Sequence, residues 1–179
     1  MRAMRRPRLV LSVLAVLLLA LAAALLTAGG SSAAPSKSQS LFRKTLLKDP
    51  KTTSAVRNLL RSGGIVAPDI AFADLTGDGR SDAVVLVDSG GIAGAVALYV
   101  FSTDGEAAES DLRAVYRSQR LYRASAEIAA GRLMVRTPRF TEGDDVCCPA
   151  KVVRRTYAWN DGDNALRLRN SKEMEGPTG

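Results

Sequence analysis

The stretch that decides the fold is DLTGDGRSDAVVLV, from Asp74 to Val87. Its last five residues, 83–87, are apolar and mostly β-branched, which is the pattern of a central strand buried on both faces. The residues before them combine Asp, Thr and Gly, which is typical of a tight turn that leads into a strand. The sequence therefore predicts a buried β-strand entered through a glycine-rich turn.

Two short helices are predicted on the N-terminal side of this strand. The first covers residues 41–47 and is interrupted by Pro50, which cannot continue a helix. The second is capped by Thr52 or Thr53 and ends at Ser62-Gly63-Gly64. Each helix has a single apolar stripe, so both are expected to pack on a sheet.

On the C-terminal side of the central strand, apolar residues recur at every second position, as in β-strands. Besides residues 83–87, the clearest strand patterns are at 95–101, 112–117, 124–128, 133–137 and 152–159. Helices followed by strands with short turns indicate an α+β domain. We expect two short N-terminal helices packed on a mainly antiparallel, meandering sheet of about six strands.

The N-terminus has the composition of an export segment. Four arginines within residues 1–8 precede an apolar run of 18 residues, from Leu9 to Leu26. This length lies between a signal-peptide core of about 7–15 residues and a membrane-spanning helix of about 20. Residues 1–33 are therefore expected to be a signal peptide cleaved after Ala33, or alternatively an uncleaved membrane anchor. Either way, we expect an extracytoplasmic protein that is secreted or anchored to the cell membrane.

The rest of the chain is expected to form three segments. They are a flexible tether at 34–40, a single α+β domain at 41–169 and a disordered tail at 170–179. The whole chain has a net charge of +7, but residues 1–33 contribute four arginines and no acid, so the remainder carries +3. The basic balance therefore gives no reason to expect nucleic-acid binding.

The acidic turn before the central strand is a candidate calcium site. Oxygen-bearing side chains occupy alternating positions that fit an EF-hand loop: Asp74, Thr76, Asp78 and Asp82. Val85 stands where such a loop has its bidentate Glu. The alternative is that these aspartates accept hydrogen bonds from the N–H groups of the turn itself. Calcium is the single cofactor that the sequence suggests.

The two cysteines of the chain, Cys147 and Cys148, are adjacent. Two cysteines in a chain without histidine cannot complete a zinc site alone. In an oxidising compartment we expect a vicinal disulfide, or a thiol pair, that shapes its loop. A redox switch or a crosslink to another chain is the alternative.

Arginines are dense in the second half of the chain. Four of them are candidate anion-binding residues because alternation places them on strand faces: Arg113, Arg117, Arg132 and Arg136. The alternative is a solvated strand face without a ligand. Catalysis has little support, because a chain without histidine has no Ser/His or Cys/His nucleophile. We therefore expect a protein that is not an enzyme.

Several short motifs resemble a widespread group of bacterial secreted proteins and lipoproteins, and most of all the CseA-type lipoproteins of actinobacteria. They lie between residues 43 and 160 and comprise Lys48-Asp49-Pro50, Ala73-Asp74-Leu75-Thr76-Gly77, Tyr99-Val100, Glu142-Gly143-Asp144 and Thr156-Tyr157-Ala158-Trp159. Two features depart from the CseA type. No cysteine follows the apolar run to carry a lipid, and the Cys147-Cys148-Pro149 loop belongs to the wider group.

The resemblance implies a role outside the membrane in modulating an envelope-stress response through a sensor kinase and a sigma factor. We therefore expect a non-catalytic, envelope-associated protein that binds a membrane sensor protein. The alternative is a structural or adhesive module that binds calcium or an anionic cell-wall polymer.

Overall fold

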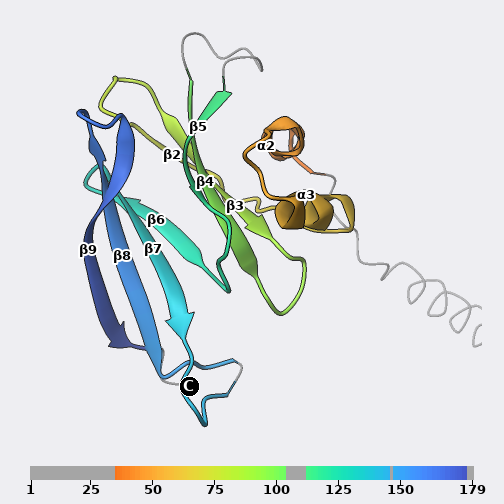
Figure 1. Cartoon of the computed structure of the whole chain (residues 1–179), viewed down its shortest axis with the longest axis vertical. Helices are drawn as coiled ribbons and strands as arrows, with labels where there is room; N and C mark the ends of the chain where they lie inside the picture. The colour runs from red at the N-terminus through yellow and green to blue at the C-terminus, as the bar shows by residue number, and fades with distance from the viewer. Residues whose placement is uncertain (1–34, 104–111, 146, 177–179) are drawn as a thin grey trace, which may run out of the picture. The chain divides into compact units, whose positions relative to one another are not determined.

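Figure 1 shows the computed structural model, which describes residues 35–103, 112–145 and 147–176. The expected export segment, residues 1–33, lies outside the described residues. The described chain starts with two helices and continues with nine strands. The α+β class expected from the sequence is therefore confirmed.

The two helices are α2 (Lys37–Lys48) and α3 (Ser54–Arg61). Helix α2 begins inside the segment expected to be a tether, because Ser36 and Gln39 form a reciprocal capping box at its start. Thr53 caps α3, as the sequence predicts, by accepting a hydrogen bond from the Val56 N–H. The helices are thus defined by their own capping residues.

The first sheet contains five antiparallel strands: β1 (Ile65–Val66), β2 (Ala71–Ala73), β3 (Asp82–Asp88), β4 (Ala95–Thr103) and β5 (Leu112–Ser118). The order is β1-β3-β4-β5, and β2 also pairs with β3. Residues 83–85 and 87 of β3 are buried. The central strand predicted from the sequence is therefore confirmed.

The second sheet contains four antiparallel strands: β6 (Ser125–Ala129), β7 (Arg132–Arg139), β8 (Lys151–Asn160) and β9 (Ala165–Glu175). The expectation of one meandering sheet of about six strands is therefore wrong. After β5 the chain continues alongside the start of β4 and the residues before it, where the amides of Leu121 and Arg123 donate to the carbonyls of Val96 and Ala93. The strands that follow start a separate sheet. Strand β9 also extends to Glu175, through residues expected to belong to the tail.

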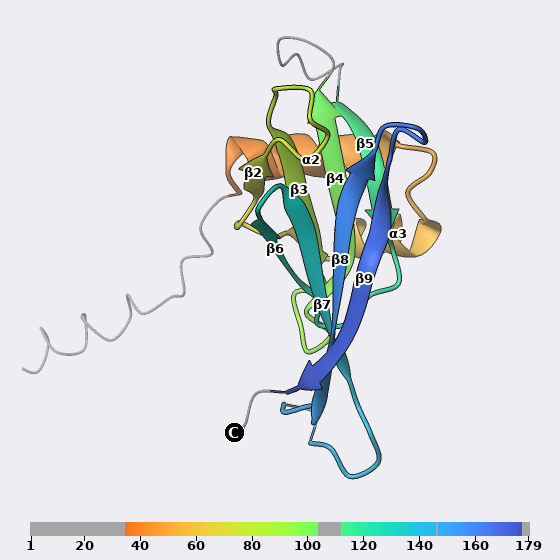
Figure 2. The same cartoon turned by 90° about the vertical axis from the view of Figure 1, so that its left-hand side faces the viewer.

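The domain has three layers, with the first sheet in the middle (Figures 1 and 2). One face of the first sheet packs against the helices in a core of Phe42, Leu46, Val56, Leu60, Val85, Val87, Tyr99 and Phe101 with smaller neighbours. The other face packs against the second sheet in a core of Leu75, Val84, Leu98, Val100, Leu133, Val135 and Leu166. Both faces of β3 and β4 are thereby buried, which explains why the sequences of these strands are almost continuously apolar.

Tyr116 of β5 and Tyr157 of β8 meet between the two sheets, with ring centroids 5.0 Å apart. Burial, and next the interaction with Tyr157, raises the pKa of Tyr116 above its usual value near 10. In the unfolded chain the same phenol loses its proton near pH 10. The free energy of unfolding should therefore fall as the pH rises above about 10.

This alkaline loss is expected to be smaller in Tyr116→Phe, which has no phenol to ionise. The difference should be at most about 1.4 kcal/mol for each pH unit above 10, and less here because the ring is only half-buried. Urea denaturation of both proteins at pH 8 and pH 11 measures it. Equal losses in the two proteins would contradict the prediction.

Candidate functional site

The acidic turn of residues 74–81 connects β2 to β3, and its carboxylates bond mainly to the turn itself. Asp74 accepts hydrogen bonds from the N–H groups of Gly77 and Gly79, at 2.6 and 2.9 Å. The carboxylate of Asp78 bonds to the backbone N–H and guanidinium of Arg80, which lowers the pKa of Asp78. These bonds hold the turn in the shape that leads into β3.

Asp82, at the start of β3, is fully buried and closes the turn. Its Oδ2 accepts hydrogen bonds from the backbone N–H groups of Leu75 and Thr76, at 2.8 and 2.9 Å. Its Oδ1 and the Thr76 hydroxyl are buried and have no hydrogen-bond partner among the described residues. No group of three or more Asp, Glu or Cys side chains in the described chain is arranged to hold a metal ion.

Calcium binding by this turn stays a prediction, and the two unpartnered oxygens are the atoms that a cation would satisfy. If the turn binds calcium, Ca²⁺ should raise the melting temperature and EDTA should reverse the rise. Asp82→Asn should abolish the response, because it removes the buried negative charge. A melting temperature that neither Ca²⁺ nor EDTA changes would leave the turn with a purely structural role.

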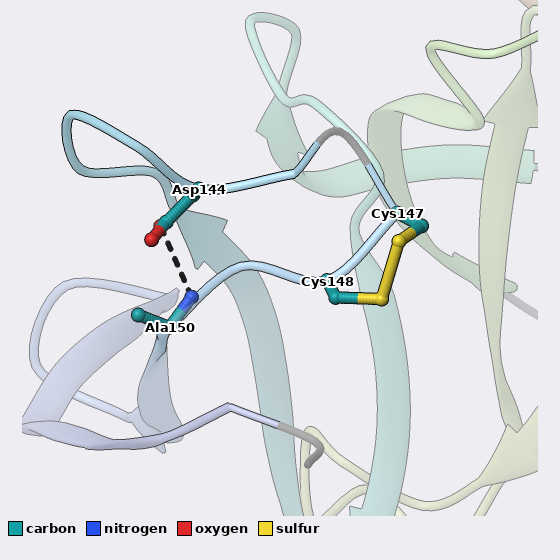
Figure 3. Close-up of a disulfide and its surroundings, with 4 residues drawn as sticks. All are labelled: Asp144, Cys147, Cys148 and Ala150. Atoms are coloured by element: carbon teal, nitrogen blue, oxygen red, sulfur yellow. Dashed lines mark hydrogen bonds between the residues drawn. A yellow bond between two sulfur atoms is a disulfide. The ribbon is translucent and has the colours of Figure 1, made fainter. Parts of the chain in front are cut away.

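Cys147 and Cys148 form a disulfide in the exposed loop between β7 and β8 (Figure 3). Asp144 organises this loop: its carboxylate accepts hydrogen bonds from the N–H groups of Thr141 and Ala150, at 2.8 and 3.0 Å. These two bonds lower the pKa of Asp144, because they favour the charged carboxylate. The disulfide therefore lies in a loop whose two ends are tied together by one side chain.

An intramolecular disulfide has a clear signature in intact-mass analysis. The chain should stay monomeric on a non-reducing gel and resist alkylation until it is reduced, and then gain two alkyl groups. A single-cysteine variant, Cys148→Ser, is the control: its remaining thiol should be alkylated without reduction. Alkylation of two thiols before reduction would show that the pair is free in the purified protein.

The four candidate arginines do not form one site. Arg113 and Arg117 lie on β5 in the first sheet, whereas Arg132 and Arg136 lie on β7 in the second. Arg117 pairs with Asp49 at 2.9 Å, and Arg136 pairs with Glu127 through two hydrogen bonds of 2.9 and 2.7 Å. The structure therefore divides the predicted anion-binding set into two pairs.

The first pair lines a cavity between the end of α2 and β5. Its volume is about 450 Å³, and its charged residues are Lys48, Asp49, Arg113 and Arg117. Nε and Nη2 of Arg117 both donate to Oδ2 of Asp49, so the one acid of the lining is already engaged. The cavity is therefore mainly cationic.

A second cavity of about 210 Å³ lies beside the disulfide. Cys147 and Pro149 line one side, and Arg123, Arg136 and Val152 are among the other lining residues. Tyr122 and Phe140, whose rings meet edge to face with centroids 5.8 Å apart, are partly exposed. The sequence showed the cysteines and Arg136 separately, but gave no sign that the chain brings them to one cavity.

Arg132 and Arg136 also belong to a larger cationic surface that the sequence did not reveal. Pairing of β7, β8 and β9 places Arg136 directly opposite Arg154, and Arg154 directly opposite Lys172. The alternation of each strand was visible in the sequence, but the partner of each strand was not. Arg154 and Lys172 are thus functional candidates that only the strand register identifies.

Comparison with curated proteins adds one finding to this geometry. A stretch of 138 residues is 30% identical to a protein of Streptomyces avermitilis named "Lipoprotein CseA". This chain is similar to CseA. The match covers 76% of this chain and 61% of the CseA protein, so the chain spans about three fifths of the relative's length. The resemblance to CseA-type lipoproteins expected from the motifs is supported to that extent.

No protein-family model and no solved structure matches the chain. None of the helices in the described residues is both long and apolar enough to cross a membrane. The apolar run of residues 9–26, where the sequence predicts such a segment, lies outside that part. The similarity to CseA is therefore the comparison that bears on function.

Proposed function

We propose that this chain is an envelope-associated, non-catalytic protein that acts outside the cytoplasmic membrane. The similarity of 138 residues to the lipoprotein CseA is the observation that carries the proposal. The cationic, apolar start of the chain supports it, since this is the composition of an export segment. The lack of histidine in the whole chain supports a binding role rather than nucleophilic catalysis.

The finer proposal is that the protein modulates envelope-stress signalling by binding the extracytoplasmic part of a membrane sensor protein. This role follows from the resemblance to CseA-type lipoproteins. The edge-to-face pair Tyr122 and Phe140 and the disulfide loop are candidate surfaces for a partner, since exposed aromatic side chains are frequent anchors of protein interfaces.

In-cell crosslinking of the tagged full-length chain, followed by mass spectrometry, tests both levels of the proposal. Recovery of the chain in envelope fractions and of a sensor-kinase ectodomain in the crosslinked product is expected. A variant that lacks residues 1–33 is the control, because it should stay in the cytoplasm and lose the crosslink. Recovery of the chain with itself alone, or with cell-wall polymer, would contradict the sensor-binding role.

A structural or adhesive role is the second candidate function. A calcium-binding turn at Asp82 would support it, and so would binding of an anionic cell-wall polymer. The observation that favours the polymer is the open, cationic face of the second sheet, which carries Arg132 and Arg136.

A further inference from the structure

The outer face of the second sheet, directed away from the first sheet, carries five basic side chains. Figure 2 looks onto this sheet, and no described helix or strand covers it. Arg136, Arg154 and Lys172 lie side by side on β7, β8 and β9, in one cross-strand row. Arg132 and Arg167 share this face, because their neighbours Leu133 and Leu166 point into the core.

The row places like charges directly opposite each other. Such neighbours have Cβ atoms only about 4.5–5.5 Å apart and destabilise a sheet. Arg136 is neutralised by Glu127, and Arg167 pairs with Asp163 at 2.9 Å. By contrast, the side chains of Arg132, Arg154 and Lys172 make no hydrogen bond or ion pair with any described residue. The fold therefore tolerates a repulsive row for which the described chain supplies little compensation.

We propose that this face binds a linear, phosphate-bearing polyanion, whose charges would compensate the row. Four of its five cations are arginines, whose planar guanidinium groups bind phosphate oxygens through two parallel hydrogen bonds. The cations lie on three neighbouring strands of an open sheet, so a flexible chain can contact several of them in succession. The proposal specifies the ligand class and the binding site of the adhesive candidate function. Its biological role rests on the proposed location in the cell envelope.

The composition of the face favours a hydrated polymer over a lipid bilayer or a protein. Binding at a bilayer surface combines cations with apolar side chains that enter the headgroup region. Protein interfaces are likewise built around exposed aromatic or aliphatic anchors. Among the described residues, the exposed large hydrophobic side chain within the strands of the second sheet is Leu168 of β9, which pairs with Tyr157 and points to the opposite side.

Long-chain polyphosphate is the probe, titrated into the purified full-length chain in mild detergent at 50 and 200 mM salt. The chain should bind it, and the affinity should fall steeply with salt because bound counterions are released. The triple variant Arg132→Gln, Arg154→Gln, Lys172→Gln should bind at least about tenfold more weakly and show a flatter salt dependence. Its melting temperature should be unchanged or higher, because the substitutions remove like-charge repulsion.

The matched control removes the same charge from exposed positions outside the second sheet: Lys37→Gln, Lys51→Gln, Arg61→Gln. This variant should bind polyphosphate like the unmodified chain. Equal losses in the two triple variants would overturn the proposal, because net charge alone would then explain binding. No binding at 50 mM salt, or binding to phosphatidylglycerol vesicles but not to polyphosphate, would overturn it as well. Polyphosphate binding by a chain that fractionates with the cytoplasm would contradict the proposed location and leave the site intact.

Discussion

Replacing Asp82 by alanine is expected to lower the free energy of unfolding by about 3 kcal/mol or more. The carboxylate is fully buried, and one of its oxygens accepts hydrogen bonds from the N–H groups of Leu75 and Thr76. Alanine would leave both donors without their partner, and each unsatisfied buried group costs about 1–3 kcal/mol. The turn and the start of the central strand should loosen together.

Urea denaturation followed by circular dichroism measures this effect. Asp82→Asn keeps an acceptor oxygen of similar size, so it should be less destabilising than Asp82→Ala. Asp78→Ala is the matched control in the same turn, because Asp78 is exposed and bonds mainly to the neighbouring Arg80; its melting temperature should stay close to that of the unmodified chain. If Asp82→Ala and Asp78→Ala had the same small effect, the buried carboxylate would not be what holds the turn.

Replacing Phe101 by alanine is expected to destabilise the domain by about 3–5 kcal/mol. The ring is 1% exposed, and its centroid lies 5.1 Å from that of Phe42 on α2 and 6.0 Å from that of Tyr99. It therefore joins the helical layer to the first sheet. Its removal leaves a cavity that rigid strands cannot close, which adds to the lost burial of apolar surface.

The same denaturation experiment, with hydrogen exchange of α2 as a second readout, checks this prediction. Phe72→Ala is the control, since Phe72 on the edge strand β2 is 57% exposed and should cost far less. Amides of α2 should exchange faster in Phe101→Ala than in Phe72→Ala. Equal stability of the two variants would mean that the helices do not depend on this aromatic contact.

Much of the fold could be predicted from the sequence because its signals are local. The run of residues 83–87 predicts the central strand, and Thr53 marks the start of α3. Helix α2 starts earlier than its apolar pattern predicts, because the capping box of Ser36 and Gln39, itself a sequence signal, begins the helix. The turn at residues 74–81 was also foreseen, including the alternative that its aspartates bond to backbone N–H groups.

The division into two sheets could not be predicted in the same way. An alternating strand shows which side chains share a face, but it does not show which strand it pairs with or which layer it joins. The candidate arginines illustrate the difference. Arg113 and Arg117 look equivalent to Arg132 and Arg136 in the sequence, yet they lie on different sheets.

The sequence by itself determined the elements, because helix caps, turns and hydrophobic periodicity depend on residues a few positions apart. Only the tertiary structure decided that Arg136, Arg154 and Lys172 form one row and that Cys147 shares a cavity with Arg136. These neighbours are brought together by pairing between strands and by the packing of two cores. Strand register and layer packing depend on contacts between residues far apart in the chain, and no local pattern encodes them.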